Sequence, residues 1–146
     1  MTISVIVKLI VDCFKNGKKV LACGNGGSAA MASHMAAELV GIYGNSKALP
    51  AIALTDIAVI TAIANDLGYK EVFSRQVEAL GKKGDILIVF TTSGKSKNII
   101  EAMYQAKLRG IDIIDMSRIK GTIQEIQENQ LHLTHRICKL VKQQFK

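Results

Sequence analysis

The chain has 146 residues, of which 49% are hydrophobic and 21% charged, with a single proline. This length and composition fit one folded domain, and they exclude intrinsic disorder and collagen-like or low-complexity structure. The net charge of +7 suits an anionic partner, either a nucleic acid or a phosphorylated metabolite. The basic residues are scattered and there is no Trp to stack on bases, so we expect no nucleic-acid partner.

The cysteines and the apolar stretches indicate a compartment. Cys13, Cys23 and Cys138 are an odd set without CxxC spacing, each within an apolar stretch, which is typical of a reduced cytoplasmic protein. No apolar run approaches the roughly 18 residues that a membrane span needs. We therefore expect a cytoplasmic protein without a membrane partner.

Apolar periodicity and breaker residues divide the chain into alternating helices and strands. The expected elements are a helix over 2–15, a strand over 18–23, a helix over 29–40, a strand over 51–55, a short helix over 56–64 ended by Asn65-Asp66, a helix over 70–80, a strand over 85–90, a helix over 97–109, a strand over 111–116 and a long helix over 123–144.

This alternation predicts an α/β fold: a single doubly wound domain with an open parallel sheet and helices on both faces, because consecutive parallel strands need a crossover that a helix supplies. In such folds ligands bind beyond the carboxyl ends of the strands. Two loops occupy that position here, Gly24–Ser28 and Thr91–Ser96.

The loop Thr91–Ser96 combines four hydroxyl side chains with a glycine and precedes a helix. Main-chain N–H groups, hydroxyls and the positive end of the helix dipole together can bind a phosphate, and Lys95 could add a charge. The alternative is that Ser96 only caps the helix and the rest is a polar turn. The sequence alone leaves both interpretations open.

The glycine loop partly matches a dinucleotide-binding pattern. Gly24, Gly26 and Ala29 fit G-x-G-x-x-A, but the nearest acidic residue at the end of the next strand, Asp56, lies 30 residues after Gly26 rather than about 20. No Gly-Lys-Ser/Thr follows as in a Walker A loop. Nicotinamide binding is therefore disfavoured.

Two helices carry polar residues with catalytic potential. His34 and Glu38 are four residues apart on an otherwise apolar helix and share a face. They suit a structural hydrogen bond as well as they suit catalysis or metal binding. On the last helix, periodicity places Glu128 about 20° from His135, but Gln127 about 80° away. Spacing alone thus favours Glu128 as the companion of His135.

Several motifs together resemble the sugar isomerase (SIS) domain family, and within it the phosphoheptose isomerases. The resemblance runs from about Lys18 to Leu140 and depends on Cys23–Ala30, His34, Ala36–Leu39, Thr61–Asp66, Phe73–Arg75, Thr91–Ser96 and Ile126–Glu128. It implies conversion of sedoheptulose 7-phosphate to D-glycero-D-manno-heptose 7-phosphate through an enediol, in a cytoplasmic homotetramer with sites between subunits.

The resemblance also assigns residues. Glu38 would be the catalytic base and His135 its acid partner. The substrate-binding positions would be Asn25, Gly26, Gly27, Ser28, Asp66, Thr91, Thr92, Ser93, Ser96 and Gln127. Zinc would be bound by His34, Glu38, Gln127 and His135, so the resemblance favours Gln127 where periodicity favours Glu128.

The chain also departs from the family. Between Ser117 and Ile123 only five residues stand in place of a loop, a helix and an edge strand, and Arg118-Ile119 resembles the tail of that strand. The N-terminal helix is shortened, and Lys95 replaces an Asn. A non-catalytic SIS-domain binding module of the replication-initiator-associating type and a sugar-phosphate sensor are the alternatives, but the presence of both Glu38 and His135 favours an enzyme.

Overall fold

The computed structural model describes residues 1–42, 44, 46–117 and 121–146. Its elements are α1 (Ile3–Lys15), β1 (Val20–Gly24), α2 (Gly27–Val40), β2 (Ala51–Ala53), α3 (Ile57–Leu67), η2 (Tyr69–Glu71), α4 (Ser74–Leu80), β3 (Ile86–Phe90), α5 (Lys97–Leu108), β4 (Asp112–Asp115) and α6 (Ile123–Gln143). The expected order of elements is confirmed. The strand remnant expected at Arg118-Ile119 lies outside the described residues.

Two expected boundaries were wrong. The helix expected to stop at Asn65-Asp66 continues to Leu67, because the break comes at Gly68, whose φ of 94° ends the helix. The helix expected over 70–80 is divided into η2 and α4. Between them Val72 and Phe73 are buried in the core, at 0% and 2% exposure.

The described strands form one parallel sheet in the order β2-β1-β3-β4. The β1–β3 register runs from Val20 opposite Ile86 to Gly24 opposite Phe90. The chain moves outward from β1 to β2 and then returns past β1 to β3, so the topological switch point lies between β1 and β3. Ligands of open α/β sheets bind in the crevice at such a point.

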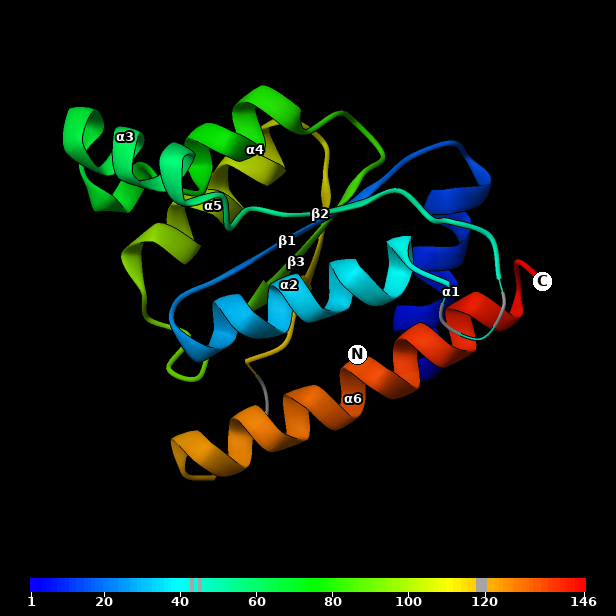
Figure 1. Ribbon diagram of the computed structural model, residues 1–146. Helices are drawn as coiled ribbons and strands as arrows, with labels where there is room; N and C mark the ends of the chain where they lie inside the picture. Colours follow the sequence, from blue (N-terminus) through cyan, green and yellow to red (C-terminus); the bar gives the residue numbers. More distant parts are fainter. Residues whose placement is uncertain (43, 45, 118–120) are drawn as a thin grey trace.

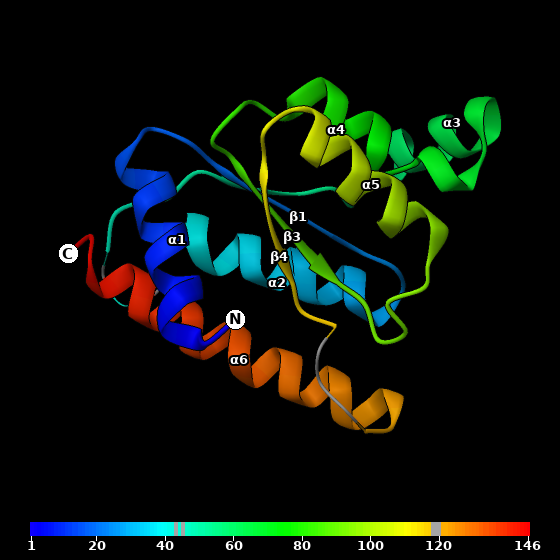
Figure 2. The ribbon, with the colours of Figure 1, turned by 180° about the vertical axis from the view of Figure 1, so that it is seen from behind.

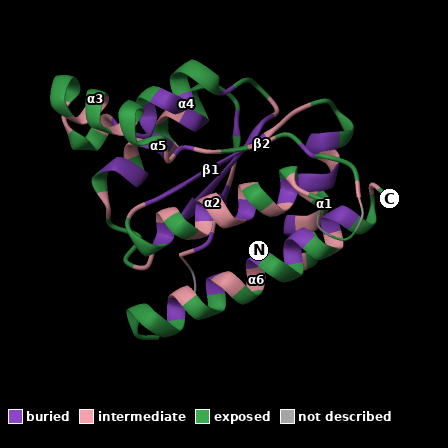
Figure 3. Ribbon diagram, in the orientation of Figure 1, coloured by how far each residue is buried: buried purple, intermediate pink, exposed green. Residues whose placement is uncertain are grey.

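Helices cover both faces of the sheet, as expected (Figures 1 and 2). Alternate strand residues such as Val20 and Ile88 join α1, α2 and α6 in one apolar core. Their neighbours, such as Leu21 and Leu87, join α4 and α5 in the other. α3 packs only loosely on this second side and has no buried residue (Figure 3).

α2 and α6 lie side by side on the first face and run in the same direction (Figure 1). Gln127 near the start of α6 contacts Gly27 at the start of α2. At the other end, the Lys142 Nζ donates to the carbonyl of Gly41, 2.7 Å away.

No helix in the described ranges is long and apolar enough to cross a membrane.

Candidate active site

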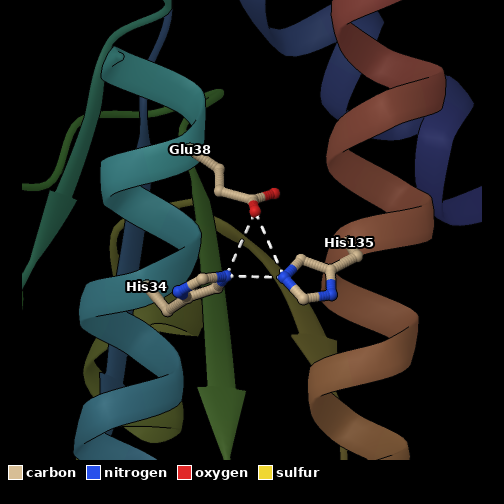
Figure 4. Close-up of side chains that lie close together, drawn as sticks. All are labelled: His34, Glu38 and His135. Carbon is tan, nitrogen blue, oxygen red and sulfur yellow. Dashed lines mark hydrogen bonds and ion pairs between the residues drawn. The ribbon is translucent and has the colours of Figure 1, made fainter. Parts of the chain in front are cut away.

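Three polar side chains converge where α2 and α6 face each other (Figure 4). The Nε2 atoms of His34 and His135 lie 2.9 Å apart. Both are also close to one carboxylate oxygen, Oε1 of Glu38, at 3.1 Å from His34 and 3.3 Å from His135. The fold thus brings together two residues of α2 with one that follows about 100 positions later.

The carboxylate of Glu38 is mostly buried, with 11% of its side chain exposed. Its second oxygen, Oε2, has no hydrogen-bond partner among the described residues. The Cys138 thiol lies beside this group: burial raises its pKa, and the charge of Glu38 raises it further. The two histidines are more open, at 39% and 46% exposure, so solvent reaches the cluster from their side.

The cluster of His34, Glu38 and His135 has the composition of a metal site. One ligand atom from each residue lies within 4.8 Å of the others. Two Nε2 atoms 2.9 Å apart can share one proton, or both can direct a lone pair at a cation. Imidazole nitrogens with a carboxylate oxygen are ligands that zinc prefers, so these residues fit a metal ion chemically.

Gln127 faces α2, whereas Glu128 is exposed. A Cβ on Gly27 would lie 2.9 Å from Gln127 Cδ, so the Gln127 amide fills the space that this glycine leaves. No hydrogen bond joins Gln127 to the cluster in the described part of the chain. Spacing favoured Glu128 as the companion of His135, but Gln127 is the residue that faces α2.

The loop Thr91–Ser96 is organised by its own side chains. The Thr91 Oγ1 accepts from the Gly94 N–H at 3.1 Å, and the Ser93 Oγ accepts from the Lys95 N–H at 3.2 Å. Gly94 has φ of 65°, which the turn requires. Ser96 occupies the N-cap position of α5, but its side chain makes no capping hydrogen bond. The Ser96 hydroxyl therefore does not cap α5, in contrast to the alternative that Ser96 only caps this helix.

The glycine loop begins beside this hydroxyl-rich loop, since β1 and β3 are neighbours. Gly24 must be a glycine because a Cβ there would lie 2.5 Å from the Ser28 carbonyl oxygen. Gly26 has φ of 55°, and Ser28 is buried. The side chain of Asn25 pairs with that of Asn98 of α5.

Asp66 does not reach the cluster within one chain. It lies near the end of α3, on the sheet face opposite α2 and α6, where it accepts a hydrogen bond from the Asn65 side chain at 2.9 Å (Figures 1 and 2). The Thr91–Ser96 loop is also remote. It lies near the start of α2, and Glu38 follows the first residue of that helix by eleven positions, which corresponds to about 16 Å.

Three residues that the sequence did not single out support these loops. Asn98 and Tyr69 bond to Asn25. Gln130, fully buried on α6, donates to the carbonyl oxygens of Thr91 and Met116 at 3.1 and 2.9 Å. Gln130 thereby connects α6 to the ends of β3 and β4. Gln130 could have been found from the sequence as a polar residue within the apolar stripe of α6.

The fold and the cluster define an open α/β protein with a polar site between two helices and a hydroxyl-rich loop at its switch point. Residues 1–117 match the model of the SIS domain. The chain belongs to the SIS domain family.

Similar proteins make the relationship more specific. The chain is 45% identical to a phosphoheptose isomerase of Campylobacter concisus, over 95% of this chain and 83% of that protein. It is 49% identical to one of Glaesserella parasuis, over 87% and 67% of the two chains. The fold is similar to a phosphoheptose isomerase structure from Francisella tularensis, with a TM-score of 0.93 and 36% identity over 97% of this chain and 85% of that one. A Neisseria gonorrhoeae phosphoheptose isomerase gives 0.89 and 38%, over the same shares of the two chains.

Proposed function

We propose that this protein is an aldose–ketose isomerase that interconverts sedoheptulose 7-phosphate and D-glycero-D-manno-heptose 7-phosphate. The observation that carries the proposal is the convergence of Glu38 and His135, 3.3 Å apart, in a chain similar to phosphoheptose isomerases over most of its length. The reaction moves a proton between adjacent carbons, so it needs a base beside the carbon and an acid near the carbonyl oxygen.

Glu38 is the base in this proposal. Its carboxylate, which lies beside the two histidines, removes a proton from C1 of the ketose and returns it to C2. His135 donates a proton to the carbonyl oxygen of the substrate from the ring nitrogen that carries one, and recovers it from the neighbouring hydroxyl. An exposed imidazole can reach a sugar that approaches from solvent.

Zinc is the metal that we propose for the cluster, bound by His34, Glu38 and His135, with Gln127 as a fourth ligand after its amide turns from Gly27. When bound, the ion would polarise the oxygens of the substrate. The donor set supports this assignment, and the three free, buried cysteines are consistent with the reducing cytoplasm that we infer.

We further propose a homotetramer in which each site combines residues of more than one copy. An extended heptose phosphate is about 10 Å long, if its carbon chain has the same rise per bond as an extended polypeptide backbone. The rise of about 16 Å along α2 from Gly27, near which the Thr91–Ser96 loop lies, to Glu38 exceeds this length. The Thr91–Ser96 loop and Lys95 of one copy would bind the phosphate, and Glu38 of another would act on the sugar. Asn25, Ser28 and Asp66 would line the sugar site.

The test is direct observation of the sugar. Purified, zinc-supplied protein is incubated with sedoheptulose 7-phosphate, and NMR follows the anomeric signals of the aldose. We expect steady conversion to an equilibrium mixture. An unchanged spectrum from folded, oligomeric protein would instead favour a non-catalytic SIS-domain binding module.

A further inference from the structure

Asn25 and Asn98 form a reciprocal amide pair. The Asn25 Nδ2 donates to the Asn98 Oδ1 at 2.9 Å, and the Asn98 Nδ2 donates back to the Asn25 Oδ1 at 2.8 Å. The Tyr69 hydroxyl donates to the same Asn25 Oδ1 at 3.0 Å. Both lone pairs of this oxygen are therefore in use, and the plane of the Asn25 amide is fixed.

The pair connects the two loops of the switch point. Asn25 belongs to the glycine loop after β1, and Asn98 lies in the first turn of α5, directly after the Thr91–Ser96 loop. Tyr69 adds a third segment, η2, which follows α3 and its Asp66. Three pieces of chain to which the proposed function assigns substrate contacts thus meet at one amide group.

The two partners of Asn25 differ in burial. Asn98 is 3% exposed, whereas Tyr69 is 57% exposed. A buried amide is costly to leave without hydrogen bonds, so the Asn98 side chain favours the arrangement that satisfies it, and Asn25 must follow. The Tyr69 hydroxyl can exchange with water at small cost.

We propose that Asn98 is a positioning residue of this enzyme: through its reciprocal pair with Asn25 it holds the glycine loop at a fixed distance from the phosphate-binding loop. The role rests on the proposed function. Asn25 retains one free amide hydrogen and its main chain for the substrate, and Asn98 determines where that hydrogen points. Small misplacement of a substrate-orienting group lowers turnover strongly.

The experiment compares Asn98→Ala, Asn98→Asp and Tyr69→Phe with the wild type. For each we measure kcat and KM for the heptose phosphate, and the inhibition constant of inorganic phosphate. Asn98→Ala should lower kcat about tenfold. Asn98→Asp should lower it at least as much, because it sets an oxygen against the Asn25 Oδ1. Tyr69→Phe should change kcat by no more than about threefold, since water replaces its hydroxyl.

The phosphate constant separates positioning from direct binding. The Thr91–Ser96 loop keeps its own hydrogen bonds in all three variants, so the inhibition constant should stay within about twofold of wild type. Asn16→Ala is the matched control, because Asn16 makes a single side-chain bond, to the Asp12 carbonyl at the end of α1. It should leave both constants unchanged.

A second measurement does not depend on turnover. If the pair forms in solution, Asn25→Ala and Asn98→Ala should each lower Tm by about 3 °C, and the double variant should fall little further. Unchanged kcat in Asn98→Ala, a phosphate constant that rises as kcat falls, or additive Tm changes would each overturn the proposal. Failure of the proposed function is distinguishable from failure of this proposal. An inactive wild type would refute the proposed function, whereas the coupled Tm changes of the Asn25 and Asn98 variants would persist.

Discussion

The two oxygens of Glu38 have different surroundings. Oε1 contacts both histidines, and Oε2 has no partner in the described part of the chain although it is buried. An unsatisfied buried acceptor costs free energy, so a structural ion pair alone does not account for Oε2. This unsatisfied acceptor beside two histidines is the feature of Glu38 that favours a functional role.

Glu38→Gln and His135→Gln should each lower kcat by about 10² to 10⁴, because each variant removes a proton-transfer group and leaves the helices in place. Initial rates with sedoheptulose 7-phosphate measure this. His132→Gln is the matched control: His132 is exposed on the same helix and should retain wild-type turnover. Equal losses in His132→Gln and His135→Gln would contradict the assignment.

The three thiols are expected to be unreactive. Burial raises the pKa of Cys13 to about 11 and that of Cys23 to about 12, and the pKa of Cys138 is raised by burial and by Glu38. Because the thiolate is the reactive form, native protein at pH 8 should give almost no colour with a disulfide reagent, and denatured protein should give three equivalents. Rapid labelling of the native protein would contradict the burial of the three thiols.

At the scale of elements, the start of β3 depends on one carboxylate. Asp85 is 1% exposed and accepts from the main-chain N–H groups of Lys19 and Lys82, and from the Lys19 ammonium. Burial acts to raise the pKa of Asp85, but these hydrogen bonds outweigh it and lower the pKa overall. Asp85 thereby joins the start of β1 to the turn before β3.

Asp85→Asn should lower the free energy of unfolding by about 1–3 kcal/mol at pH 7, because the charge-assisted bonds are lost. Since the pKa is lower in the folded state, the stabilisation is present above the unfolded-state pKa of about 3.9 and is lost as pH falls through the folded value. Urea unfolding should therefore show a constant difference between pH 5 and 8 that narrows below about pH 4. A difference independent of pH would contradict this.

The elements also show which features can be predicted from sequence. Apolar strands and breaker residues predicted the parallel sheet, because burial on both faces leaves a strong pattern. The predicted end of α3 was too early because the last helical turn tolerates Asn65-Asp66. The positive φ of Gly68 is what ends the helix. Ideal phase favoured Glu128 over Gln127, but the small Gly27 opposite lets the Gln127 amide approach α2.

For the whole molecule, the resemblance to the SIS family predicted a contact between residues far apart in the sequence. The resemblance brought Glu38 and His135 together, and the structure has them in contact. It also assigned Asp66 and the Thr91–Ser96 loop to a site formed between subunits, and that assignment stays a prediction. The supporting amide of Asn98 was missed because a single Asn in a helix start carries no distinctive pattern.

The apolar surface of α3 provides a prediction about assembly. Ile57 is 77% exposed and Leu67 54%, and no residue of α3 is buried. Ile57→Lys should therefore leave Tm nearly unchanged for the isolated chain but shift the protein to smaller species in light scattering, with a loss of turnover. A fully active monomer would contradict the proposal that copies share the site.

The reaction itself is tested most directly by running it in D2O. We expect zinc-supplied wild-type protein to convert sedoheptulose 7-phosphate into the aldose with deuterium at C2, because the proton held by Glu38 exchanges with solvent. Glu38→Gln should form neither product nor label. Wild-type turnover by Glu38→Gln, or no product from the assembled wild-type protein, would contradict this mechanism.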